Sequence, residues 1–253
     1  MGAIASVLYG ALAYLLFLGT FLYAIAFVGN LPVPKTIDSG AAGPLVPALI
    51  INTLLLGLFA IQHSVMARPA FKRWWTRFVP ESIERSTYVL FSSLALVALF
   101  AWWEPMGGVV WDAPAGLIRG SVIALYLFGW ALLLYTTFLI DHFDLFGLKQ
   151  VWRRSSGKPY QPPQFYTPSL YRIVRHPLYV GWLTIFWAAP TMTVAHLVFA
   201  LATTAYILIA IQLEEHDLVE AFGDRYVSYR RVTPMLIPRL ARRRAESRSA
   251  ANS

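Results

Sequence analysis

Two polar segments organise this chain: Y-R-I-V-R-H-P-L-Y-V-G-W (Tyr171–Trp182) and Q-L-E-E-H-D-L-V-E-A-F-G-D-R-Y-V-S-Y-R-R (Gln212–Arg231). The apolar run between them is interrupted at A-P-T-M-T (Ala189–Thr193). As one helix, the whole run would be about 55 Å long, far more than the ~30 Å hydrocarbon core of a bilayer. We therefore predict a helical hairpin folded at Pro190, which returns both polar segments to the same membrane face.

The closed hairpin would bring complementary charges together. Pro177 suits the first position of a helix, whose N-terminus offers unpaired N–H groups and a partial positive charge. With Arg172 and Arg175 beside it, this end favours a carboxylate or a phosphate. Glu214 and Glu215 end the returning helix, where carboxylates suit an ammonium group or ribose hydroxyls. S-adenosylmethionine carries a carboxylate, an ammonium group, a ribose and a positive sulfonium, so we predict it as the cofactor.

The composition is that of a polytopic membrane protein. Of the 253 residues, 57% are hydrophobic and 13% are charged, which is too apolar for a soluble domain. The chain has no cysteine, so it has no disulfide framework, no thiolate metal site and no thiol nucleophile of its own. A net charge of +8 is typical of cytoplasmic loops facing a lipid bilayer, and we expect no nucleic acid as a partner.

Six apolar segments can serve as membrane spans, which predicts an all-α, polytopic helical bundle ending in a helical hairpin. The spans are Ile4–Val28, Pro44–Met66, Ser86–Trp103, Leu117–Ile140, Pro177–Ala189 and Thr193–Leu213. The fifth is short for a full crossing. The first lacks a basic n-region and is too long for a signal peptide, so we expect it to be retained. We expect a single domain at residues 1–240, followed by a basic, disordered tail at residues 241–253.

The basic residues support this number of spans. With six spans, all but two of the 21 lysines and arginines fall on the side of the N-terminus, and the exceptions are Lys35 and Arg119. The positive-inside rule then predicts a multi-pass protein of the bacterial cytoplasmic membrane, with both termini in the cytoplasm. Without the hairpin, the arginine-rich tail would lie on the opposite side.

Three further polar residues at this face are candidates for proton transfer. His63 lies near the end of the second span, and a histidine at this depth either bridges helices through hydrogen bonds or has a functional role. The fourth span exits into D-H-F-D (Asp141–Asp144), where His142 or Asp144 could act as a general base or pair with the basic loops. Neither histidine has helical i, i+4 spacing with another ligand, and we predict no metal site.

Aromatic residues continue the second polar segment. Leu218, Phe222, Tyr226 and Tyr229 recur at helical spacings, which predicts one face of an amphipathic helix that prolongs the sixth span. This face either packs against the cytoplasmic loop or forms a wall of the cofactor pocket, with aromatic rings near the adenine or the sulfonium.

The polar segments contain R-H-P-x-Y-x-G (Arg175–Gly181) and E-E-x-x-L-x-x-x-F-G-x-x-Y-x-x-Y (Glu214–Tyr229). This pair resembles the cofactor signature of integral-membrane methyltransferases of the isoprenylcysteine carboxyl methyltransferase type. The stretches Q-H-S-V-M-A-R, H-F-D-L-F-G-L-K-Q-V-W and F-W-A-A-P-T-M-T-V-A-H-L are similar to nurim-related membrane proteins and, within them, to bacterial methanethiol S-methyltransferases. The resemblance covers most of the chain, from about Ile61 to Pro238.

The resemblance implies an activity and a site. The activity is methylation of a small thiol, methanethiol, by S-adenosylmethionine, which gives dimethyl sulfide and S-adenosylhomocysteine. By position, one side of the cofactor site would be formed by Arg175, His176, Pro177, Tyr179 and Gly181, and the other by Glu214 and Glu215, with Tyr226 and Tyr229 closing it.

The attacking group in such a reaction is the thiolate, and a thiol is mostly protonated at neutral pH. A base or a cationic neighbour therefore helps, and our candidates are His142, His63 and Asp144, in that order. Two other functions stay open. One is methylation of a larger lipid-borne substrate, such as a prenylcysteine carboxylate or an amine; the other is a non-catalytic, nurim-like role in the membrane.

Overall fold

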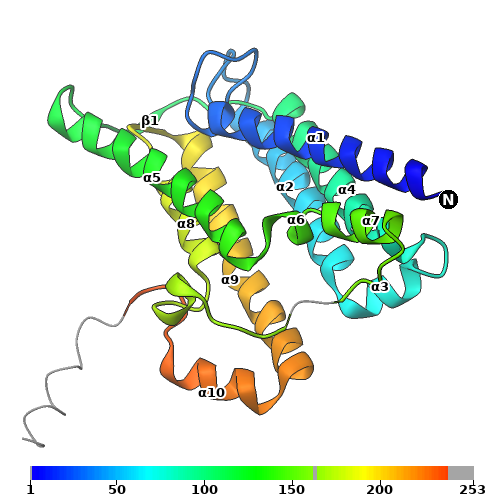
Figure 1. The fold of residues 1–253 in the computed structure, drawn as a ribbon. Coiled ribbons are helices and arrows are strands. Elements are labelled where there is room, and N and C mark those ends of the chain that lie inside the picture. Colours follow the sequence, from blue (N-terminus) through cyan, green and yellow to red (C-terminus); the bar gives the residue numbers. More distant parts are fainter. Residues whose placement is uncertain (1, 162–163, 239–253) are drawn as a thin grey trace, which may run out of the picture.

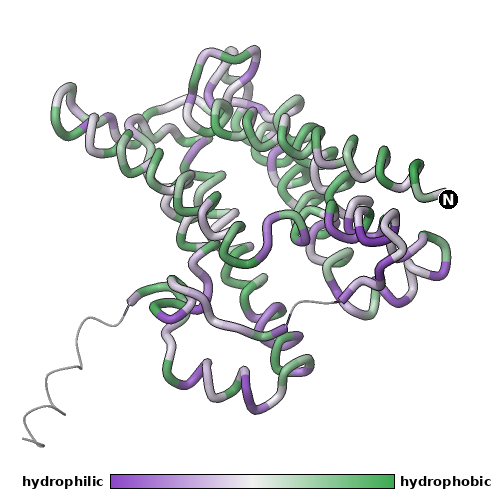
Figure 2. Tube along the Cα trace, viewed as in Figure 1, coloured by the Kyte–Doolittle hydropathy of each residue, from purple (hydrophilic) through white to green (hydrophobic). Residues whose placement is uncertain are grey.

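The computed structural model describes residues 2–161 and 164–238, which are mostly helical (Figure 1). Five of the helices in these ranges are long and apolar enough to cross a membrane. They are α1 (Ala3–Val28), α2 (Leu45–Ala67), α4 (Glu81–Trp102), α5 (Leu117–Ile140) and α9 (Val194–Phe222). Figure 2 shows apolar residues along most of their length. The predicted all-α, polytopic fold is confirmed, while the predicted tail at residues 241–253 lies outside the described residues.

Shorter elements connect the long helices. The helical ones are α3 (Pro69–Trp75), α6 (His142–Leu145), α7 (Leu148–Ser155), a 3-10 turn η1 (Ser169–Arg172), α8 (Pro177–Trp187) and α10 (Asp224–Val232). Two short strands, β1 (Val109–Asp112) and β2 (Thr191–Thr193), complete the described elements. The fifth predicted span is therefore the 11-residue helix α8, which is too short to cross a bilayer alone.

Two of the long helices extend beyond the predicted spans. Helix α4 begins at Glu81 rather than Ser86, because Glu81 and Glu84 occupy its first turn, where carboxylates are stabilised by the helix dipole. Helix α9 continues from Leu213 to Phe222, so Glu214 and Glu215 lie in its extension beyond the predicted span. Charged residues end an apolar run but do not end a helix, and the sequence pattern misses both extensions for this reason.

The predicted hairpin folds back between α8 and α9. The Pro190 carbonyl accepts a hydrogen bond of 2.8 Å from the Ala113 backbone, next to the antiparallel pairing of β1 with β2. Thr193 caps α9 by accepting from the His196 backbone, and the His196 ring donates from Nε2 to the Phe186 carbonyl at 3.0 Å. His196 therefore has a structural role at the turn. The small ribbon was not predicted, because its strands are only three and four residues long.

Helix α8 is held along its length by α5. The two helices meet at Gly129 and Gly181, where the absence of a side chain allows the backbones to approach closely. A Cβ atom on Gly181 would lie 3.1 Å from the Leu133 backbone nitrogen and 3.2 Å from the Gly129 carbonyl oxygen. This packing supports a helix that is too short to span the bilayer without a neighbour.

The prediction of one continuous helix through Tyr226 and Tyr229 is wrong. Helix α9 ends at Phe222, and Gly223 adopts φ 57° and ψ −135°, a conformation open essentially to glycine alone. Helix α10 then starts at Asp224 and runs back beneath the bundle (Figure 1). The aromatic stripe has helical spacing on both sides of this turn, so periodicity does not reveal the break.

We predict that Gly181→Ala lowers the melting temperature of the detergent-solubilised protein. The added methyl group overlaps the α5 backbone, and overpacking of this kind costs about 1–3 kcal/mol. Gly120→Ala in α5 is the matched control, because a Cβ atom there meets nothing within 4 Å. Equal melting temperatures for the two variants would contradict the close α5–α8 packing.

Candidate active site

A cluster of buried charges joins the start of α8 to the end of α9. The Arg175 Nε donates to Glu215 Oε1 at 2.7 Å, and the His176 Nε2 donates to the same oxygen at 3.0 Å. Arg230 of α10 lies 3.7 Å from the other carboxylate oxygen. The Glu215 side chain is only 6% exposed, so the three donors compensate a charge that water cannot reach.

Arg175 also anchors the segment that follows α10. Its guanidinium donates to the carbonyls of Arg230 and Thr233, at 3.1 and 2.5 Å. The backbone N–H groups of Arg175 and His176 donate to the carbonyls of Pro234 and Met235. Two of the N–H groups near the start of α8 are therefore hydrogen-bonded within the chain and are not free to bind a ligand.

Glu214, the acid that precedes Glu215 in α9, has a different hydrogen-bond partner. The Tyr179 hydroxyl donates to Glu214 Oε2 at 2.9 Å, and Tyr179 lies one turn beyond His176 in α8. Pro177 occupies the first position of α8, as predicted, where its missing N–H is not needed. The predicted meeting of the two polar segments is therefore found in the structure.

Helix α10 covers this cluster with aromatic rings. The Tyr229 hydroxyl donates to the Tyr171 carbonyl at 2.5 Å, and burial raises the pKa of Tyr229 to about 12. Burial also raises the pKa of Tyr226, whose side chain is 2% exposed. Among residues 2–161 and 164–238, the Tyr226 hydroxyl has no hydrogen-bond partner. A buried hydroxyl without a partner beside Arg175 and Glu215 is typical of a site that awaits a polar ligand.

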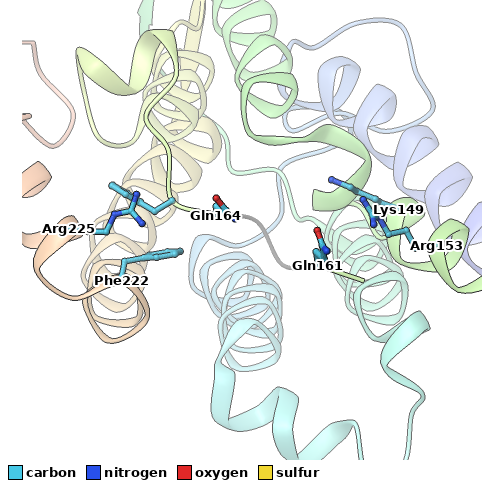
Figure 3. A pocket seen from close by; sticks show the side chains of 7 residues that line it. Lys149, Arg153, Gln161, Gln164, Phe222 and Arg225 are labelled. Atoms are coloured by element: carbon cyan, nitrogen blue, oxygen red, sulfur yellow. The ribbon is translucent and has the colours of Figure 1, made fainter. Parts of the chain in front are cut away.

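A cavity of about 670 Å³ opens beside these rings (Figure 3). Its walls come from α7, the loop after it, and the junction between α9 and α10. The lining residues are Lys149, Arg153, Gln161, Gln164, Phe165, Phe222 and Arg225. Phe165 links the cavity to the charged cluster, because its ring centroid lies 5.9 Å from that of Tyr226 and 5.6 Å from that of Tyr229.

Two residues predicted for the cofactor site have other surroundings. Arg172 is exposed in η1, and its Nε donates to the Thr167 carbonyl. Gly181 faces α5, where it allows the helices to pack closely, rather than facing the charged cluster. Both residues lie in the same polar segment as Arg175, and sequence position alone does not separate a residue that contacts the cluster from one that packs against a neighbouring element.

His142 and Asp144 lie in α6, outside the charged cluster. The Thr137 hydroxyl already donates to the Leu134 carbonyl, so it accepts from His142 Nδ1 at 2.9 Å. His142 Nε2 then accepts from the Tyr14 hydroxyl at 2.9 Å, which fixes a neutral ring between α1 and α5. Burial lowers the pKa of His142.

Asp144 belongs to a separate network in the same loop. It accepts hydrogen bonds from Gln150 Nε2 at 3.2 Å and from the Tyr160 hydroxyl at 3.1 Å. Burial raises the pKa of this carboxyl and raises that of Tyr160 to about 12. The neighbouring Asp141 pairs with Lys149, a residue that also lines the cavity.

His63 lies in a third polar group, between α2 and α4. The Tyr88 hydroxyl is 2.8 Å from His63 Nε2, and the Ser92 hydroxyl is 3.1 Å from Nδ1. Tyr206 of α9 bonds to Ser64, the residue after His63, at 3.1 Å. Glu214 is close enough to act electrostatically on Tyr88 as well as on Tyr179, so this group faces the acidic end of α9.

Sequence analysis did not single out Tyr88, Tyr206, Phe165 or Thr233. Each lies within an apolar span, a proline-rich loop or a terminal segment. An isolated tyrosine, phenylalanine or threonine in such a segment is not part of a recognisable motif. A possible signal was the position of Tyr88 and Tyr206 in spans that end on the same membrane face. A polar ring at that depth needs a hydrogen-bond partner.

One group of side chains in the described ranges could gather around a metal ion. Atoms of His216, Asp217 and Glu220 lie within 4.8 Å of one another near the C-terminal end of α9. His216 and Glu220 are exposed, and Asp217 forms a 2.7 Å ion pair with Arg68. The three form a solvated charge cluster, and they are not among the residues predicted for the site.

Comparison with known proteins identifies close relatives over nearly the whole chain. A methanethiol S-methyltransferase of Crocosphaera subtropica is 55% identical over 91% of each chain. A protein of the same name from Mycobacterium tuberculosis is 54% identical over 92% of this chain and 96% of its own. The chain belongs to the methanethiol S-methyltransferase family. Nurim of Rattus norvegicus is a more distant relative of this family, 34% identical over 68% of each chain.

No family model matches this chain. No solved structure matches it either.

We predict that His142 makes the folded protein sensitive to acid. Because burial lowers its pKa below the unfolded value of about 6.5, the unfolded state binds a proton that the folded state resists, and stability falls as the pH drops through that range. The melting temperature should therefore fall less for His142→Gln than for the wild type between about pH 7.5 and pH 5.5. Parallel pH profiles would show that another group controls the acid sensitivity.

Proposed function

We propose that this protein transfers a methyl group from S-adenosylmethionine to methanethiol, giving dimethyl sulfide and S-adenosylhomocysteine. The observation that carries the proposal is the junction of Arg175, His176 and Glu215 between α8 and α9, in a chain whose close relatives are named methanethiol S-methyltransferases. The lack of cysteine in the chain agrees with a reaction in which both sulfur atoms belong to the reactants.

The charged cluster suits the amino-acid half of the cofactor. Arg175 provides a positive guanidinium for a carboxylate, while Glu214 has a carboxylate oxygen beyond the one that Tyr179 occupies, suited to an ammonium group. The unpartnered Tyr226 hydroxyl can bond to either. When bound, S-adenosylmethionine supplies an activated methyl group, because its sulfonium leaves as a neutral thioether. The residues of the chain hold the reactants in line and exclude water.

The thiol must lose its proton before it attacks. The thiolate sulfur forms a bond to the methyl carbon as the carbon–sulfonium bond breaks, and the thiol proton passes to a base. His142 was the first candidate, but it lies in a group tied to α1 and α5, outside the charged cluster. Asp144 is bonded to Gln150 and Tyr160.

His63 is the candidate that the geometry favours. Its partner Tyr88 is close enough to feel the charge of Glu214, so this group borders the proposed cofactor site. Burial and the charges of Arg85 and Arg68 disfavour a protonated His63, so its ring is neutral, the form that can accept a proton. Positive neighbours stabilise the thiolate relative to the thiol, so a weaker base is sufficient to remove the proton. We propose His63 as the group that accepts the proton.

We further propose that the protein is a multi-pass protein of the bacterial cytoplasmic membrane with both termini in the cytoplasm. The basic residues of the α3 region, of α7 and of α10 then face the cytoplasm, as the positive-inside rule requires. This orientation places the charged cluster at the membrane surface that a water-soluble cofactor reaches. A small volatile thiol can reach the same site from the lipid.

We predict that Glu214→Ala weakens binding of S-adenosylmethionine by about tenfold or more, as loss of a charged hydrogen bond implies. Isothermal titration calorimetry on the purified protein measures the change. Glu220→Ala is the matched control, since this acid lies on the same helix with its side chain 67% exposed. Helical content from circular dichroism shows that both variants are folded. Equal affinities for the two would remove Glu214 from the cofactor site.

We predict that the purified protein produces dimethyl sulfide from methanethiol and S-adenosylmethionine, as measured by headspace gas chromatography. His63→Ala should lower turnover most at mildly acidic pH, where little thiolate forms unaided, and His142→Ala should lower it to a similar extent at every pH. A protein that binds the cofactor but methylates only lipid-borne acceptors would contradict the choice of substrate. Absence of both binding and product would favour a non-catalytic, nurim-like role.

A further inference from the structure

Aromatic rings gather around His63, the proposed proton acceptor. Phe59 lies one turn before it in α2 and stacks on its ring, with centroids 5.1 Å apart and planes inclined by 25°. The Tyr88 ring of α4 also lies 5.1 Å from the imidazole. Tyr206 of α9 meets Phe59 edge to face, with centroids 6.3 Å apart. Three helices therefore contribute a ring to the surroundings of one imidazole.

The His63 ring can be reached from between the helices. Phe59 and His63 follow Asn52 on α2 at helical spacings, which places both within about 20° of it around the helix axis. Asn52 is fully buried, whereas Phe59 and His63 are half-buried. The exposed face of α2 carries Ile61 and Val65, and it lies on the opposite side of the helix. The exposed parts of Phe59 and His63 therefore border space between α2, α4 and α9 rather than the outer face of the bundle.

Two links fix the separation of α2 from α9 beside His63. The hydroxyls of Ser64 and Tyr206 are 3.1 Å apart, within hydrogen-bonding distance. One turn further along α2, Arg68 pairs with Asp217 at 2.7 Å, and its Nε donates to the Ser64 carbonyl at 3.2 Å. Because both links join the same two helices, the space beside His63 has a fixed width, and the side chains that line it decide what fits.

The lining of this space suits a small apolar thiol. Phe59, Tyr88 and Tyr206 present apolar ring surface, and sulfur makes favourable contacts with aromatic rings. His63 offers a nitrogen that can accept the thiol proton. A longer alkyl chain meets the Phe59 ring, which is packed between His63 and Tyr206.

We propose that Phe59 and Tyr206 are specificity-determining residues, which limit the molecule that reaches His63 to a thiol of about the size of methanethiol. This inference rests on the proposed function and deepens it, because it explains how the site rejects bulkier acceptors. Removing one of these rings adds room beside His63 without removing the proton acceptor or the charged cluster. Selectivity among thiols should therefore change more than the rate with methanethiol.

The first measurement compares methanethiol with 1-propanethiol as acceptors for the full-length protein in detergent. The wild type should prefer methanethiol, and Phe59→Ala should reduce that preference, as a ratio of kcat/KM values, by about tenfold or more. Tyr206→Ala should act in the same direction. Phe128→Ala is the matched control, because this ring is 57% exposed on α5 and its loss should leave the ratio unchanged. An unchanged ratio in both folded test variants overturns the inference.

A second measurement needs no methyl transfer. The chain has no cysteine, so Ser92→Cys introduces a single thiol at a position 3.1 Å from His63 Nδ1. With methyl methanethiosulfonate, the thiolate forms a new sulfur–sulfur bond as that of the reagent breaks and methanesulfinate leaves. Mass spectrometry follows this reaction and that of the bulkier benzyl methanethiosulfonate, with both rates normalised to those of glutathione. The methyl reagent should react about tenfold faster or more, and Phe59→Ala should narrow the difference.

Ser93→Cys is the control for access, because the Ser93 side chain is 2% exposed and lies on another face of α4, so neither reagent should label it readily. Equal normalised rates in Ser92→Cys, or no reaction with either reagent, overturn the inference. Size-selective labelling in a protein that forms no dimethyl sulfide would support the size limit and reject the proposed function, so the two can fail separately. If Phe59→Ala fails to fold, as judged by circular dichroism and gel filtration, Tyr206→Ala tests the same space.

Discussion

The structure depends on one buried carboxylate, that of Glu215, which must be compensated near the C-terminal end of α9. Arg175 and His176 provide that compensation from the start of α8, so the two helices have to fold back on each other. The short length of α8 follows from this constraint, because the helix needs only to connect the turn at Pro190 with the charged cluster. The Gly129–Gly181 contact with α5 stabilises it in the absence of a full crossing.

The same ion pair organises the segment that covers the charged cluster. Arg175 bonds to carbonyls of α10 and of the residues that follow it, and Gly223 turns α10 back over the cluster. Aromatic rings of α10 then close one side, and Phe165 of the preceding loop completes the wall. A buried polar cluster of this kind lies in a low dielectric, where charge complementarity is strong.

Much of the fold could be predicted from the sequence, because apolar runs, Pro177 and Pro190 each have a direct backbone consequence. The contact of Arg175 with Glu215 followed from charge and from the hairpin. The break at Gly223 could not be predicted, since helical spacing continues on both sides of it. The surroundings of Arg172, Gly181 and His142 depend on neighbouring helices, so the sequence alone does not separate residues that face the cluster from residues that pack against α5 or α1.

The most direct test of this account is a double-mutant cycle on the free energy of unfolding in detergent, using Arg175→Met, Glu215→Gln and the double variant. If the pair ties α8 to α9, each single change leaves a buried partner uncompensated. The double variant should then be more stable than the sum of the single effects implies, by about 1 kcal/mol or more. Additive effects, within about 0.5 kcal/mol, would contradict the central role of this ion pair.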